Sequence, residues 1–153
     1  MKALILSVGM FLGSLVNSQN ITFQNGLYYE DGNLFTGKYV LYFESGATKE
    51  DLSIKDGKLN GEVVEYYENG TKKEVGQYEN NLKFGLWSRY SAAGKLMATA
   101  SYKADKKDGQ WVVYNENGAK LFQMEYKDGE KAGTWYQWND QGEVIKTTTY
   151  SNM

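Results

Sequence analysis

The chain has 153 residues, with 17 Lys and Arg against 19 Asp and Glu, and a formal net charge of −2. It contains no Cys, His or Pro, which excludes disulfides, Cys-ligated metals, and Ser–His–Asp or Cys–His catalysis. The mildly acidic balance predicts no binding to nucleic acid and no strong binding to anionic membranes, because both need a basic surface.

The first 18 residues have the pattern of a secretory signal peptide. Lys2 precedes an almost continuous apolar run that ends at Val16, and compact residues there fit cleavage before Gln19. The run is short for a membrane-spanning helix. We therefore expect residues 1–18 to direct export to the periplasm, the cell envelope or the medium, either cleaved or retained as an anchor. Cleavage would remove Lys2 and change the net charge to −3.

Residues 19–36 are expected to form an N-terminal cap. The segment from Leu27 to Gly37 is similar to the second half of the repeat that follows, but its spacing is one residue longer. Terminal units of repeat arrays are commonly atypical because they cover the end of the stack. The sequence therefore predicts a cap that contains a partial repeat.

A repeat of 24 residues occupies the rest of the chain. Two glycine series keep this step without insertion: Gly46, Gly70, Gly94, Gly118 and Gly142, and Gly37, Gly61, Gly85, Gly109 and Gly133. A fixed period of this length indicates stacked supersecondary units, none of which can bury its apolar face alone. Five repeats are expected over residues 37–153: 37–60, 61–84, 85–108, 109–132 and 133–153.

Each repeat has the pattern of one β-hairpin. In the fourth repeat, β-branched and aromatic residues from Gly109 to Tyr114 predict a strand, and the Asn-Gly pair ending at Gly118 predicts a turn. A return strand from Ala119 to Tyr126 and a second turn over 127–132 complete the unit. The glycine of the first turn persists while its neighbour changes, which predicts positive φ there. The expected fold is all-β, an elongated single-layer antiparallel meander of hairpins with almost no helix.

The pattern G-x-W-x-x-Y-x-E-N-G-x-x-x-x-x-x-x-Y-x-x-G-x-x-x-G, from Gly109 to Gly133, resembles the MORN-repeat-variant family. The resemblance extends over about residues 26–150 and implies a twisted single-layer array of hairpins. Many bacterial members of that family carry a toxin–antitoxin antitoxin label, and eukaryotic relatives are linked to membranes and scaffolding. The resemblance provides no catalytic, cofactor-binding or metal-binding residues.

These observations favour a non-enzymatic protein-binding or scaffold protein. An antitoxin-like or immunity-like role is one form of it, with a toxin or an envelope component as partner. The first alternative is a carbohydrate-binding module, provided that Trp and Tyr side chains of the repeats are exposed rather than packed as the core. A remote alternative is a hydrolase using two carboxylates held roughly 5–10 Å apart.

The last repeat carries the candidate partner site. It has three aromatic residues within four positions, which serve either as a hydrophobic end cap or as a contact surface. The final strand, Val144 to Tyr150, carries one charge, at Lys146, whereas natural edge strands are usually defended by several devices. A partner strand or a second copy of the chain is expected to pair there. The candidate residues are Trp135, Tyr136, Trp138, Thr148 and Tyr150.

Overall fold

The computed structural model describes residues 20–151, and the predicted signal peptide lies outside these residues. All regular structure in the described range is β, as thirteen strands without a helix. Accordingly, residues 20–151 hold no helix that is long and apolar enough to cross a membrane. The all-β prediction is confirmed for this range.

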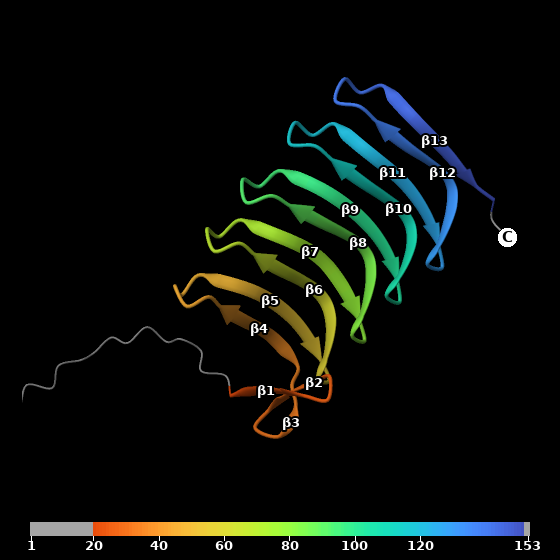
Figure 1. Ribbon diagram of the computed structural model, residues 1–153. Helices are drawn as coiled ribbons and strands as arrows, with labels where there is room; N and C mark the ends of the chain where they lie inside the picture. Colours follow the sequence, from red (N-terminus) through yellow and green to blue (C-terminus); the bar gives the residue numbers. More distant parts are fainter. Residues whose placement is uncertain (1–19, 152–153) are drawn as a thin grey trace, which may run out of the picture.

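Ten strands form one antiparallel sheet in which every strand pairs with its neighbours in sequence (Figure 1). The hairpins therefore follow one another along a single array, as the 24-residue step predicted. The strands are β4 (Gly37–Tyr42), β5 (Thr48–Lys55), β6 (Lys58–Tyr66), β7 (Lys72–Glu79), β8 (Leu82–Tyr90), β9 (Leu96–Lys103), β10 (Lys106–Tyr114), β11 (Lys120–Lys127), β12 (Glu130–Trp138) and β13 (Val144–Tyr150).

The first turn of each repeat needs its glycine. The five turn glycines, represented by Gly118, have φ between 79° and 85°, in the left-handed region. In the fourth repeat, the Gly118 N–H donates to the Asn115 carbonyl at 3.0 Å, and the Asn115 N–H donates to the Ala119 carbonyl at 2.9 Å. This is a turn followed by a glycine bulge, so the predicted positive φ is confirmed.

The second turn is shorter than the sequence suggested. We expected a turn over residues 127–132, but β11 ends at Lys127, β12 begins at Glu130, and only Asp128 and Gly129 lie between them. Their φ values are 49° and 96°, the double positive φ of a two-residue type I′ hairpin. All but the first of the repeat boundaries drawn at the glycines consequently fall inside strands; Gly133, for example, lies within β12.

The N-terminal segment forms a separate three-stranded sheet of β1 (Ile21–Gln24), β2 (Leu27–Glu30) and β3 (Asn33–Leu34). It does not extend the main sheet as a partial hairpin. Instead, the Tyr28 ring lies edge-on to Tyr39 at 6.1 Å, and the Gly57 N–H donates to the Phe35 carbonyl at 2.8 Å. These contacts place the small sheet against the first hairpins, where Figure 1 shows it at the N-terminal end of the array.

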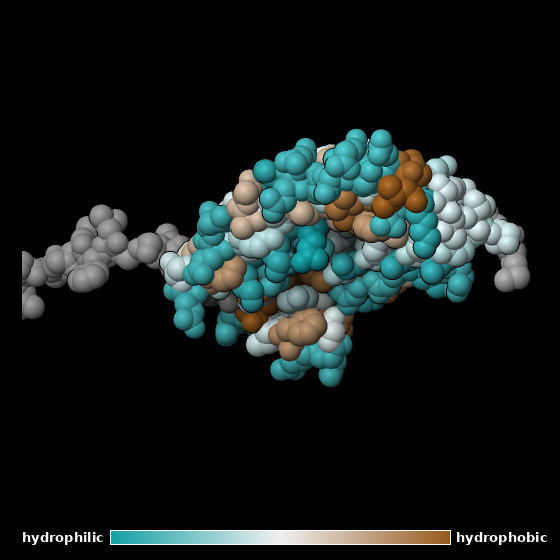
Figure 2. All heavy atoms as spheres, turned by 45° about the horizontal axis from the view of Figure 1, so that its top comes forward, coloured by the Kyte–Doolittle hydropathy of each residue, from teal (hydrophilic) through white to brown (hydrophobic). Residues whose placement is uncertain are grey.

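The main cluster of buried hydrophobic residues lies in the N-terminal half of the array, and Val112 and Ala132 are buried separately in the C-terminal half. Its buried members are Phe35, Leu52, Ile54, Val63 and Trp87, and Tyr28 of the small sheet packs against them. Later tryptophans of the same column are only half-buried. Most of the face seen in Figure 2 is hydrophilic, as expected for a single-layer sheet with so few buried side chains.

Candidate functional site

Aromatic side chains form a continuous ladder across the sheet from β7 to β13. Neighbouring ring centroids are 4.8–6.2 Å apart, and their planes are inclined by 51–89°. Such edge-on and tilted contacts are the favourable ones between aromatic rings, but they do not make a flat platform. The ladder consists of Tyr78, Trp87, Tyr102, Trp111, Tyr126, Trp135 and Tyr150.

Trp87 is the most buried member of the ladder, with 5% of its surface exposed. The indole lies directly over Gly76 of β7, where an added Cβ would be 2.1 Å from Trp87 Cδ2. Trp111 and Trp135 instead donate their Nε1–H groups to the carbonyls of Ser101 and Glu125, at 3.1 and 2.9 Å. Among the described residues, Trp87 Nε1 is buried with no hydrogen-bond partner, so Trp87 packs closely over the glycine and lacks the hydrogen bond that its equivalents make.

A column of lysines covers the ladder, and none of its members was among the residues predicted from the sequence. Lys83, Lys107 and Lys131 recur at the 24-residue step, and each ammonium lies over one Trp ring and one Tyr ring. The Nζ-to-centroid distances are 3.8 and 5.2 Å for Lys83, 4.1 and 4.7 Å for Lys107, and 5.0 and 5.2 Å for Lys131. These are cation–π contacts. The lysine recurrence was visible in the sequence, but its place over the rings was not.

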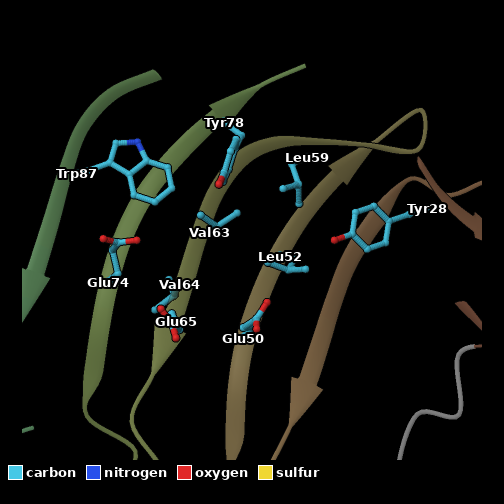
Figure 3. A pocket seen from close by; sticks show the side chains of 10 residues that line it. All are labelled: Tyr28, Glu50, Leu52, Leu59, Val63, Val64, Glu65, Glu74, Tyr78 and Trp87. Atoms are coloured by element: carbon cyan, nitrogen blue, oxygen red, sulfur yellow. The ribbon is translucent and has the colours of Figure 1, made fainter. Parts of the chain in front are cut away.

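A hollow of about 290 Å³ lies beside the N-terminal end of the ladder (Figure 3). Figure 3 shows three carboxylates along one side of it, those of Glu50, Glu65 and Glu74, which are successive cross-strand partners. Like charges opposite each other destabilise a sheet. Burial, followed by the charge of Glu50, raises the pKa of Tyr28 on the opposite side of the hollow.

Each of these three carboxylates has a lysine partner. Lys73 Nζ is 2.6 Å from Glu65, and the ammonium groups of Lys49 and Lys83 are each 3.9 Å from Glu50 and Glu74, respectively. The lysines offset the repulsion within the row. No group of side chains suited to a metal ion occurs within residues 20–151.

The structure divides the predicted C-terminal aromatic cluster between two sets of contacts. Trp135 packs against Tyr150 at 4.8 Å within the ladder, whereas Tyr136 stacks with Trp138 at 5.7 Å and an interplanar angle of 30°. The physical reason is the alternation of side chains along a strand, which directs positions 135 and 136 to opposite faces of the sheet. Thr148 lies opposite Trp135 in the register of β12 and β13.

Four of the five predicted residues border one hollow of about 290 Å³ at the end of the sheet: Trp135, Thr148 and Tyr150 from one face, and Tyr136, whose ring lies on the other face with Trp138. Trp138 does not line it. Within the described residues, β13 pairs with β12 and has no strand on its other side. Val144 and Ile145 at its beginning are 51% and 57% exposed. The free edge of β13 therefore lies beside this hollow, which three residues of the strand help to line.

The geometry defines a β-hairpin repeat protein with surfaces suited to binding. Residues 59–80, 85–104 and 107–128 match the family model described as MORN repeat variant. These segments are MORN-variant repeats, and the resemblance found in the sequence is confirmed for them.

A comparison with curated proteins finds no match. Among solved structures, the chain is similar to one in the "Crystal structure of GtfA/B complex bound to UDP and GlcNAc", with 14% sequence identity and a TM-score of 0.31. The match covers 92% of this chain and 29% of that chain. A likeness this weak supports no inference about function.

Proposed function

We propose that this chain is a non-enzymatic binding protein whose C-terminal hairpin takes up an extended segment of another protein. The observation that carries the proposal is the unpaired side of β13 beside the aromatic hollow. In strand addition, main-chain hydrogen bonds provide affinity and side-chain pockets provide specificity. Trp135 and Tyr150 would provide the walls of such a pocket.

The register of β13 indicates which backbone groups face the free side. The hydroxyl oxygens of Thr134 and Thr149 are 3.1 Å apart. Side chains approach closely in the non-hydrogen-bonded pairs of an antiparallel ladder, in which the backbone groups point away from the partner strand. The Thr149 N–H is therefore expected to point outward, where it could donate a hydrogen bond to a carbonyl of an added strand.

The test begins with the protein that co-purifies with the chain from envelope extract, which is then purified and titrated against variants. Thr149→Pro removes the outward N–H and should weaken binding at least tenfold, because proline cannot donate to an added strand. Thr149→Val is the matched control, since it keeps the N–H and the side-chain shape. If both variants bind the partner as tightly as the unmodified chain, strand addition at β13 is wrong.

The finer forms of this function belong to the same proposal. They are an antitoxin-like or immunity-like role, an envelope scaffold after export, and pairing of two copies through β13. The proposal of a non-enzymatic role is supported by the cross-strand carboxylates Glu50, Glu65 and Glu74, because each lies 2.6–3.9 Å from a lysine ammonium. Sedimentation of the Thr149→Pro variant distinguishes self-pairing, which would revert to monomer, from pairing with a different protein.

Carbohydrate binding is the second candidate, and one observation favours it. Tyr136 and Trp138 of β12 stack with ring planes inclined by 30°, and neither ring is buried. The ladder rings are too strongly inclined to one another for this use. Titration of neutral oligosaccharides against the chain and its Trp138→Ala variant tests the idea. Absence of binding, or equal binding by both, would exclude this pair of rings as a sugar site.

A further inference from the structure

The lysine column differs from one repeat to the next in its counterions. Lys83 has a carboxylate of the chain itself 3.9 Å away, that of Glu74. The residues at the place of Glu74 in the next two repeats are Ala98 and Phe122, which carry no charge. Within residues 20–151, no carboxylate lies within 4.0 Å of the ammonium groups of Lys107 or Lys131. Two repeats thus keep the ammonium and the rings but lack the carboxylate.

The space around these two ammonium groups is open. A hollow of about 700 Å³ lies between them, lined by Lys107, Lys131, Tyr126 and Tyr150, by the turn at Gly129, and by Thr149 and Ser151 at the end of the described chain. Glu130 also borders the hollow, and it forms no ion pair with either lysine. A ligand carboxylate in this hollow would complete the arrangement that Glu74 completes at Lys83.

The spacing of the column restricts the ligand. Lys107 and Lys131 lie on β10 and β12, two strands apart, which corresponds to about 9.5 Å across a sheet. A polyproline II helix has three residues per turn and a rise of about 3.1 Å, so every third side chain lies on one side at intervals of about 9.3 Å. This conformation has no internal hydrogen bonds and docks into grooves lined by aromatic rings.

We propose that the C-terminal half of the ladder binds an acidic segment in polyproline II conformation, with Asp or Glu at every third residue. One carboxylate of the segment contacts Lys107 and the next contacts Lys131, while its apolar residues pack on Tyr126 and Tyr150. The segment runs along the array, across the strands. This inference rests on the wider proposal that the chain binds proteins, but it lays the partner segment across the ladder rather than along the free edge of β13, and Tyr150 borders both surfaces.

The test uses a synthetic peptide of repeated Glu-Pro-Pro and a matched peptide of repeated Gln-Pro-Pro, titrated by calorimetry at low salt. The Glu peptide should bind, and the Gln peptide should bind at least tenfold more weakly. The double variant Lys107→Gln, Lys131→Gln should lose at least tenfold in affinity. Lys127→Gln is the matched control, because this nearby lysine is already 3.4 Å from Asp108. This variant should bind the Glu peptide with an affinity within twofold of that of the unmodified chain.

A variant that adds a carboxylate, instead of removing a lysine, tests the same ion pairing. Ala98→Glu restores the carboxylate at the place that Glu74 has in the preceding repeat. It should lower the affinity for the Glu peptide, because the new carboxylate competes with the peptide for Lys107. Thr147→Pro removes the neighbouring outward N–H of β13, two residues before Thr149, at a residue that does not line this hollow. It should leave peptide binding unchanged, so failure of the β13 proposal remains separate from failure of this one. Equal affinity for the Glu and Gln peptides, or undiminished binding by the double variant, would overturn the inference. Tighter binding of a galacturonate oligosaccharide than of the Glu peptide would assign the site to acidic glycans instead.

Discussion

Replacing Gly76 by alanine tests whether the packing of Trp87 is as close as the structure shows. Gly76 does not have positive φ, so alanine meets no backbone strain at this position. The added Cβ, however, would be 2.1 Å from Trp87 Cδ2 and 2.3 Å from Cε2. The indole cannot easily retreat, because the Tyr78 ring lies at 5.2 Å, the Tyr102 ring at 6.2 Å and the Lys83 ammonium at 3.8 Å.

Two opposing effects decide the magnitude. Overpacking a filled site costs about 1–3 kcal/mol, whereas replacing glycine by alanine inside a strand returns roughly 0.5–1 kcal/mol. We therefore expect Gly76→Ala to lower the free energy of unfolding by about 1–2 kcal/mol, dominated by the displacement of Trp87. Urea unfolding followed by far-ultraviolet circular dichroism measures this change without relying on tryptophan fluorescence.

A double-mutant cycle isolates the contact. Trp87→Val introduces the residue that Val63 already provides in the same column, and it leaves Gly76 uncovered. In that background Gly76→Ala should be neutral or stabilising, by up to about 1 kcal/mol. Stabilisation by Gly76→Ala in the unmodified chain would refute the reasoning. It would mean that Trp87 turns into the orientation of Trp111, whose neighbour is Ala100, and gains a hydrogen bond for its Nε1–H.

Three further predictions concern the turns, the charges and the N-terminus. Gly118→Val should destabilise the chain by about 1–2 kcal/mol and Gly118→Asn by less, because a β-branched residue is strained at positive φ; equal melting temperatures would contradict this. The Asp128 backbone N–H, and then Lys127, hold the pKa of Asp108 below its ordinary 3.8. The Asp108 carboxylate therefore stabilises the fold at pH values above 3.8, and this stabilisation is lost as the pH falls through the lowered pKa. Asp108→Asn should remove this part of the loss of stability in acid, which urea midpoints measured between pH 2 and 7 would reveal. The exported protein should begin at Gln19, and intact mass showing a retained Met1 would disprove cleavage.

Much of the fold was determined by the sequence itself, because its signals are local. The step between Gly94, Gly118 and Gly142 predicted the positions of the first turns, since few other residues tolerate positive φ there. The runs of β-branched and aromatic residues predicted the strands between them. Short turns between successive strands leave antiparallel pairing with the nearest neighbour as the simple solution, so the meander followed as well.

The candidate sites depended on the tertiary structure. Alternation along β12 separated Tyr136 from Trp135, and the register of β13 brought Tyr150 against Trp135. The burial of Trp87 depends on Gly76 of a neighbouring strand. Such contacts join residues of different strands, and their geometry depends on bulges and register as well as on the repeat. The sequence determined the array because each hairpin forms from its own residues, whereas the burial and charge balance of each side chain depend on which strands, and which end of the sheet, lie beside it.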